Sequence, residues 1–287
     1  MQKIMLATDF SERSDRALRR ATLLARQTGA GLCVVHVVED DQPRRLVENA
    51  REAAAAQLQD LGETLQRVDG LACETRLLLG AAFDGIVRAV AEERPELLIL
   101  GPHRRQALRD VFSGTTADRA IRAVACPVLM VNAPPVAPYR RLMLATDLSA
   151  EDARLVTTCR ALGLLDGAEA QLLHVHLSET VQQLASHGLP ANEHGMANDA
   201  AHEGAASGLD AFARSVGMAS APRMLRRGLH DTGEEILRAA SEASADLVVL
   251  GTHARSGLER FFLGSVAEAV LRRAERDVLT VPPLQEG

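Results

Sequence analysis

The chain of 287 residues contains the same pattern twice, and this duplication limits its fold more than any other feature. Residues 5–11 read MLATDFS and return 138 positions later, at 143–149, as MLATDLS. Residues 99–103 read ILGPH and return 150 positions later as VLGTH. A period this long indicates two tandem domains and excludes a solenoid of short repeats. The two offsets differ because the second copy carries a net 12 extra residues between these landmarks.

A proline-rich segment, APPVAP at 133–138, marks the joint between the copies. We therefore place domain 1 at 1–133, an extended linker at 134–138 and domain 2 at 139–287. Residues 1–138 hold 18 basic and 18 acidic residues, whereas 139–287 hold 14 and 20 and carry the whole net charge of −6. Neither half is the basic surface that binds nucleic acid or anionic lipid. No apolar run approaches the about 18 residues of a membrane span.

Short aliphatic runs alternate with longer amphipathic segments in each copy. In the first copy we expect strands at 3–7, 32–38, 71–79, 96–100 and 127–131, and helices at 12–27, 44–68, 83–93 and 115–125. Aliphatic strands alternating with helices indicate a parallel sheet covered on both faces. The predicted fold class is α/β, with two tandem doubly wound domains, each containing a five-stranded parallel sheet. In segment 186–208 of the second copy, Gly188, Pro190 and Gly195 should break any single helix, so we expect a broken helix or a mobile loop there.

The composition excludes several kinds of chemistry. The 32 basic residues are 31 Arg and a single Lys, Lys3, at the start of the chain. A Walker-type phosphate loop needs a Lys within its turn, and a Schiff-base enzyme needs a buried Lys. Seven aromatic residues are too few for a base-stacking surface. The four cysteines show no C-x-x-C spacing, so we expect free thiols and a cytoplasmic protein.

The repeated motifs fall where an open parallel sheet binds its ligands, beyond the carboxyl ends of the strands. Asp147 ends the first strand of the second copy, Gly251 follows its fourth strand, and Gly264-Ser265 opens its last helix. The start of a helix exposes unpaired N–H groups and attracts anions. The spacing alone also fits a plain turn followed by a helix start.

At these residues the chain resembles the universal stress protein family. Residues 250–268 resemble its signature loop, which reads Gly, two residues, Gly, nine residues, then Gly and Ser or Thr. The ATDFS start and the LHV end of the second strand resemble the same family. The resemblance implies flavodoxin-like domains that pair through their last strands, homodimers, and binding of ATP with Mg²⁺ in some members.

Carried over to domain 2, the resemblance implies one set of contacts for adenine and ribose and another for the phosphates. The first set is Asp147, Val175 and Gly251, and the second is Gly264, Ser265 and Val266, with His253 and Ala254 in the preceding loop. Thr146, Leu250 and Ala267 are further expected nucleotide contacts. Ala254 departs from the motif, which has Gly there, and Ala would cost about 1 kcal/mol if the loop needs a positive φ.

Domain 1 departs further from the motif. Arg104 stands in place of the second Gly, where it either fills the phosphate nest or offers an anion a charged partner. The other weaker contacts are Asp9, Val37, Gly101, Gly114 and Thr115.

No catalytic residue is predicted. The third strands end near Leu79 and Arg227, so neither copy offers the carboxylate that a phospho-acceptor site would need there. His36 and His174 end buried strands and are interpreted as structural. The intervening Gly and Pro residues should keep His187, His194 and His202 from sharing one unbroken helix, and we assign no metal.

Three functions stay open on the sequence alone. The first is an adenine-nucleotide-dependent stress-response switch that binds ATP chiefly in domain 2 and acts on an unknown protein partner. The second is an interaction module with vestigial sites, and the third is a weak ATPase.

Overall fold

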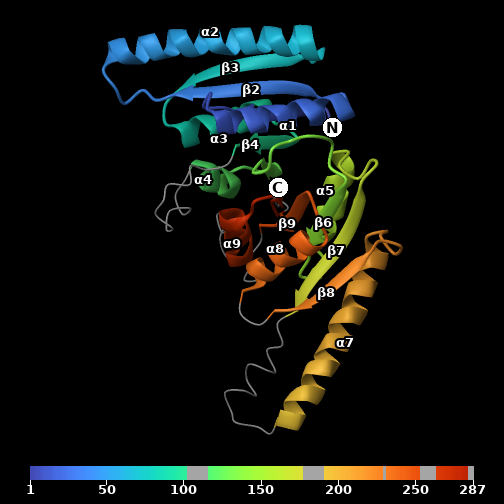
Figure 1. The fold of residues 1–287 in the computed structure, drawn as a ribbon. Coiled ribbons are helices and arrows are strands. Elements are labelled where there is room, and N and C mark those ends of the chain that lie inside the picture. Colours follow the sequence, from blue (N-terminus) through green and yellow to red (C-terminus); the bar gives the residue numbers. More distant parts are fainter. Residues whose placement is uncertain (102–115, 177–190, 229–230, 253–262, 284–287) are drawn as a thin grey trace.

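The computed structural model describes residues 1–101, 116–176, 191–228, 231–252 and 263–283, with the backbone alone for 191–198. Each copy of the repeat forms a unit of alternating strands and helices (Figure 1). Domain 1 contains β1 (Lys3–Ala7), α1 (Glu12–Thr28), β2 (Gly31–Val38), α2 (Arg44–Asp69), β3 (Cys73–Leu79), α3 (Ala82–Glu93), β4 (Leu97–Leu100), α4 (Thr116–Ala123) and β5 (Val128–Met130). Domain 2 contains β6 (Arg141–Ala145), α5 (Ala153–Ala161), β7 (Glu169–His176), α7 (Ala191–Ser215), β8 (Arg223–Arg227), α8 (Thr232–Glu242), β9 (Leu247–Gly251), α9 (Ser265–Arg273) and β10 (Asp277–Val281).

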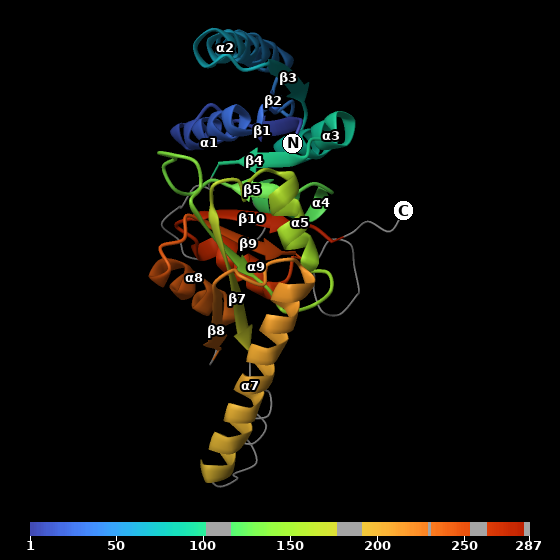
Figure 2. The same ribbon diagram turned by 90° about the vertical axis from the view of Figure 1, so that its right-hand side faces the viewer.

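The two domains share one ten-stranded sheet of order β3-β2-β1-β4-β5-β10-β9-β6-β7-β8. The strands within each domain are parallel, which confirms the predicted fold class. The last strands, β5 and β10, pair antiparallel, with Leu129 opposite Leu279. Figure 2 shows the strands stacked from β3 to β8 with helices on both sides. The pairing through last strands that the resemblance implied is therefore made inside one chain.

Alternating side chains of the strands form a core on each face of the sheet. Ile4 and Leu6 of β1 point to the face covered by α1, α2, α5 and α7, whereas Met5 points to the face covered by α3, α4, α8 and α9. All three side chains are fully buried. Helices from both domains cover each face of the sheet. The ends of the strands lie between these two helix layers and are followed by loops.

Local signals in the sequence explain where α1 begins and ends. Ser11 is its N-cap and accepts a hydrogen bond from the N–H of Ser14. Gly29 ends the helix in the left-handed conformation, at φ 73°, which only Gly adopts without strain. The expected elements of domain 1 are confirmed, with bounds that move by at most two residues.

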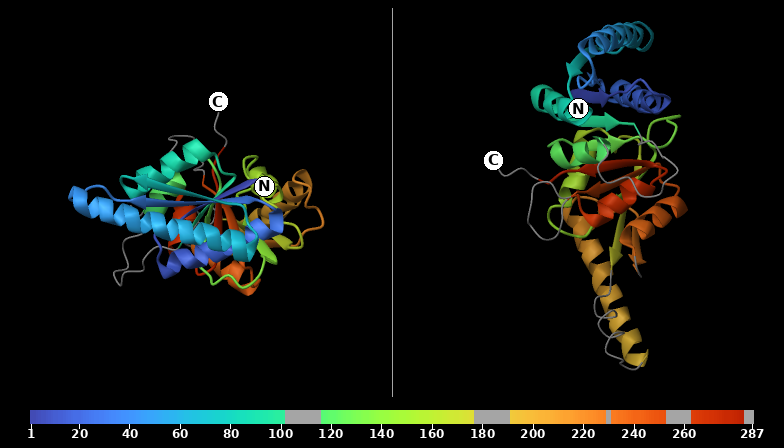
Figure 3. Two further views of the ribbon diagram at one scale, coloured as in Figure 1. Left: turned by 90° about the horizontal axis from the view of Figure 1, so that it is seen from above. Right: turned by 90° about the vertical axis from the view of Figure 1, so that its left-hand side faces the viewer.

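The prediction that Gly195 breaks the helix of the second copy is wrong, because α7 runs unbroken through it. One Gly within a helix costs only about 1 kcal/mol, which packing elsewhere along α7 can offset. That packing comes from Leu209, Phe212 and Ala213, which are buried. The other end of α7 extends past the sheet (Figures 1 and 3). Gly188 and Pro190 lie outside the described residues.

A buried ionic cluster fixes the two domains to each other. Asp277 of β10 is fully buried, and its Oδ2 accepts hydrogen bonds from Tyr139 Oη (2.5 Å) and Arg20 Nε (3.2 Å). Its Oδ1 accepts from the main-chain N–H groups of Asn132 and Ala133, both at 2.9 Å. Burial raises the pKa of Asp277, although these bonds and the charge of Arg20 act in the opposite direction. The cluster joins α1, the linker region and β10.

Candidate functional site

Strand register brings the expected adenine and ribose contacts of domain 2 to one edge of the sheet. Ala145, at the end of β6, lies opposite Leu173 of β7 and Leu250 of β9. The segments that follow are therefore neighbours: Thr146 and Asp147 after β6, Val175 in β7 and Gly251 at the end of β9. This edge lies where the chain order in the sheet reverses between β6 and β9, as ligand sites in doubly wound folds do.

In each domain a histidine fixes the turn that follows the first strand. The Nδ1 of His174 donates to the carbonyl oxygen of Thr146 at 2.8 Å, and His36 makes the same bond to Thr8 at 2.8 Å. Each imidazole fixes the first residue after the first strand of its domain. The structural interpretation of both histidines agrees with these contacts.

The turn after β6 adopts a strained backbone that positions Asp147. Leu148 has φ 68°, in the left-handed region, and its N–H donates to Thr146 Oγ1 at 2.9 Å. The N–H of Ser149 then donates to Asp147 Oδ1 at 2.9 Å. One carboxylate oxygen of Asp147 is therefore used to hold the turn, which the sequence motif alone did not reveal.

The same turn in domain 1 holds its carboxylate with hydroxyl groups. Asp9 Oδ1 accepts from the N–H of Ser11 (3.0 Å), from the Ser11 hydroxyl (2.5 Å) and from the Ser14 hydroxyl. Burial alone would raise the pKa of Asp9, but these bonds and the charge of Arg13 lower it below its ordinary value. Domain 1 thus stabilises the charge of its first-strand Asp with its own hydroxyl groups.

Domain 2 has Asp152 where domain 1 has Ser14, so the bond to the main-chain N–H of the first-strand Asp is kept, but the hydroxyl group that donates to Asp9 has no counterpart. The Oδ2 of Asp152, which is buried, accepts the N–H of Asp147 at 2.7 Å. Ser149 Oγ is buried and has no hydrogen-bond partner among the described residues. A buried polar atom without a partner costs about 1–3 kcal/mol. An incoming polar ligand at this turn is one way to satisfy it, so this observation fits a ligand with hydroxyl or phosphate groups. Neither Ser149 nor Asp152 was predicted from the sequence.

The start of α9 provides the second half of the candidate site. Gly264 is its N-cap and has no side chain to accept the first N–H groups of the helix. Ser265 is exposed, Val266 is partly buried, and Ala267 faces the core. Because α9 crosses back from β9 to β10, its first turn lies at the same edge as Gly251. These uncapped N–H groups suit an anion.

Close packing against α8 fixes the position of α9. Gly233 of α8 is buried, and a Cβ added there would lie 2.8 Å from the Cβ of Ala269. Arg273 at the end of α9 pairs with Asp231, the N-cap of α8, at 2.5 Å. No sequence signal indicated that residue 233 must be Gly.

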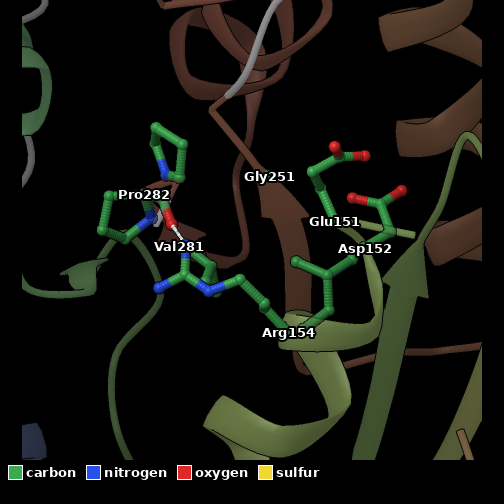
Figure 4. A pocket seen from close by; sticks show the side chains of 8 residues that line it. Glu151, Asp152, Arg154, Gly251, Val281 and Pro282 are labelled. Atoms are coloured by element: carbon green, nitrogen blue, oxygen red, sulfur yellow. Dashed lines mark hydrogen bonds between the residues drawn. The ribbon is translucent and has the colours of Figure 1, made fainter. Parts of the chain in front are cut away.

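A small open pocket lies beside Gly251, between the start of α5 and the end of β10 (Figure 4). Arg154 reaches across it and donates to the carbonyl oxygen of Pro282, and burial lowers the pKa of Arg154. The carboxylates of Glu151 and Asp152 lie on the side of Gly251 away from Pro282. Its lining consists of Glu151, Asp152, Arg154, Leu155, Gly251, Val281, Pro282 and Pro283.

Several predicted contacts fall outside the residues that the structure describes. They are His253 and Ala254 in domain 2, and Arg104, Gly114 and Thr115 in domain 1. In domain 1 the structure places Asp9, Val37 and Gly101 at the equivalent edge. A Cβ at Gly101 would lie 3.0 Å from the carbonyl oxygen of Arg13, so Gly is needed there for the close approach of α1.

The histidines of the inserted segment take part in a contact that sequence reasoning missed. His202 of α7 lies with its Nδ1 3.0 Å from Nε2 of His176, the last residue of β7. Burial lowers the pKa of His176, and the nearby charges of His202, His174 and Arg227 add to this effect. His187 and the side chain of His194 lie outside the described residues.

One group of potential metal ligands occurs among the described residues, at the opposite edge of domain 1. It consists of Cys33, Glu74 and Glu93. The ammonium group of Lys3 lies 2.6 Å from Glu93 and 3.3 Å from Glu74. The sole lysine thus takes the position that a cation would need. No helix in the described part of the chain has the length and apolar character to cross a membrane.

Comparisons with known proteins place this geometry in context. The sequence model described as the universal stress protein family matches residues 1–132 and again 138–282. Universal stress protein E of Escherichia coli K12 is 23% identical over 305 residues, which cover 99% of this chain and 95% of that protein. A universal stress protein of Thermus aquaticus is 29% identical over 133 residues, covering 45% of this chain and 97% of its own length. The crystal structure of a universal stress protein from Archaeoglobus fulgidus superposes with a TM-score of 0.73, at 17% identity, over 99% of this chain and 97% of that one. A Pseudomonas aeruginosa structure gives 0.69 at 21% identity, over 99% and 94%.

Proposed function

The chain belongs to the universal stress protein family, and we propose that its domain 2 binds ATP and switches the state of a stress-response partner surface. The observation that carries the proposal is the meeting of Asp147, Gly251 and the uncapped start of α9 at one sheet edge. The carboxylate suits sugar hydroxyls, and the helix start suits phosphates. The unpartnered hydroxyl of Ser149 at the same turn supports a polar ligand.

In this proposal domain 2 holds the nucleotide between two helix layers. Thr146, Asp147 and Val175 would contact the nucleoside, and the N–H groups of Gly264 to Ala267 would hold the phosphates. Mg²⁺ would accompany ATP and neutralise part of its charge. Nucleotide bound at this edge would change the surface that a protein partner meets.

Domain 1 has a smaller role in nucleotide binding in the proposal. Its first-strand Asp9 is already held by Ser11 and Ser14, whereas Ser149 in domain 2 lacks such a bond among the described residues. We therefore propose one nucleotide per chain. A cytoplasmic location is part of the proposal, supported by the four cysteines, all of which are free thiols in the structure.

Isothermal titration with ATP and Mg²⁺ tests the proposal. The wild-type chain should bind with a stoichiometry near one, and Gly264→Glu should lose binding because its carboxylate would stand at the phosphate position. Gly114→Glu, the matched change in domain 1, should keep it. Absence of both heat and thermal shift at millimolar ATP would favour the interaction module with vestigial sites.

A phosphate-release assay then separates a switch from a weak ATPase. The proposal expects release at the rate of a control without protein. Linear release that scales with the concentration of wild-type protein, and that Gly264→Glu abolishes, would establish turnover instead.

A further inference from the structure

One guanidinium from domain 1 links the helix starts of both domains. Arg122, in the last turn of α4, donates through Nε to Asp118 Oδ1 at 3.1 Å. Its Nη2 also lies 3.4 Å from Glu268 Oε2, across the boundary between the domains. Asp118 lies in the first turn of α4, and Glu268 lies in the first turn of α9. The two carboxylates occupy equivalent positions in the duplication, four residues after Gly114 and Gly264.

The cluster is only partly open to solvent. The Asp118 side chain is 4% exposed, Arg122 23% and Glu268 34%. Charges in such surroundings are screened less by salt and water than those at an open surface. Arg122 therefore places a positive charge beside the first turn of α9.

The position of Glu268 creates a conflict with an anionic ligand. A carboxylate in the first turn stabilises the free helix, but it repels phosphates bound at the same helix start. Arg122 offsets this repulsion from the other domain. We propose that Arg122 tunes the nucleotide affinity of domain 2, so that domain 1 acts as a charge partner of the site in domain 2; this rests on the proposed function.

Changes at Arg122 and at Glu268 should shift the affinity for ATP in opposite directions. Arg122→Gln leaves Glu268 uncompensated and should weaken ATP binding about two- to fivefold, the range expected for one charge at a helix start. Glu268→Gln removes the repulsion and should tighten binding by about twofold or more. The double variant should lie near wild type, and Arg122→Lys, which keeps the charge, should restore most of the affinity.

The duplication supplies a matched control. Arg272 occupies in α9 the position that Arg122 occupies in α4, and it is exposed. Arg272→Gln should leave the dissociation constant within experimental error. If Arg122 had only a structural role, Arg122→Gln would lower the melting temperature, and Glu268→Gln would not tighten ATP binding. The difference between Arg122→Gln and wild type should also shrink at high salt.

The titrations are done on the full chain with ATP and Mg²⁺ at low and high salt. If wild type binds and neither Arg122→Gln nor Glu268→Gln changes the affinity, the charge coupling is wrong while the proposed function stands. If Arg122→Gln fails to fold, Glu268→Gln alone decides, and unchanged or weaker binding overturns the coupling. If wild type itself does not bind, both the proposed function and the coupling are refuted.

Discussion

Replacing Arg20 by Met tests whether the buried cluster at Asp277 fixes the two domains. The change removes the guanidinium of a side chain that is only 5% exposed and leaves the fully buried carboxylate of Asp277 without its cation. Breaking a buried ion pair from one side costs about 3–5 kcal/mol. The Asp277 carboxylate keeps three hydrogen-bond donors, from Tyr139 and two main-chain N–H groups, and these limit the loss of stability. We therefore expect Arg20→Met to lower the free energy of unfolding by about 3–5 kcal/mol in urea denaturation at pH 7.5.

The pH dependence of that loss follows from the pKa of Asp277. The pKa is raised in the folded protein, so the stability that its proton provides is present at low pH and is lost as pH rises through the raised value. Arg20 lowers this pKa, and its removal should raise it further. At acidic pH the folded variant should take up a proton on Asp277 more readily than wild type does, and the neutral carboxyl group needs no cation. The destabilisation should therefore be clearly smaller there than at pH 7.5.

Two further variants sharpen the test. Arg20→Met combined with Asp277→Asn removes both charges and should recover at least half of the loss. Arg16→Met is the matched control on the same helix. Arg16 is exposed and donates to the carbonyl oxygen of Asn132 at 3.3 Å, so we expect a change within about 0.5 kcal/mol. A loss below about 1 kcal/mol for Arg20→Met, or one that does not depend on pH, would show that the Arg20–Asp277 ion pair does not hold the domains together.

Three other predictions concern packing, protonation and reactivity. Gly233→Ala should destabilise the protein by about 1–3 kcal/mol in thermal melts, because the new Cβ would meet Ala269 at 2.8 Å; an unchanged melting temperature would contradict this. The lowered pKa of His176 means that the folded state binds its proton less tightly than the unfolded state, so this contribution is present above pH 6.5 and is lost as pH falls below it. His176→Gln should therefore lose less stability than wild type as pH falls below 6.5, and an equal pH dependence of stability in both proteins would contradict this. Burial raises the pKa of Cys159 to about 12, so this thiol should react with a disulfide reagent only after denaturation, which a native-state time course checks.

Much of the fold could be predicted from local signals. The strands are short aliphatic runs, and Ser11 and Gly29 mark the ends of α1 by their capping preferences. The unbroken α7 could not be predicted in this way, since Gly195 weakens a helix locally while buried contacts such as Phe212 stabilise it from elsewhere. Propensity describes a residue and its neighbours, whereas packing depends on the whole domain.

The candidate site shows the same division. The motif positions Asp147, Gly251 and Gly264 could be read from spacing, and strand register explains why they meet. The exchange of Ser14 for Asp152 was visible in the sequence, but its effect on hydrogen bonding needed coordinates. The contact between Arg122 and Glu268 joins residues 146 positions apart, and only the antiparallel pairing of β5 and β10 brings them together.

A crystal structure of the chain grown with ATP and Mg²⁺ would show whether domain 2 binds the nucleotide. We expect a single nucleotide in domain 2, with its phosphates on the N–H groups at the start of α9 and its sugar beside Asp147. We expect none at the equivalent edge of domain 1, at Asp9. Nucleotide bound only in domain 1, or no nucleotide in domain 2 at saturating ATP, would show that domain 2 is not the binding site.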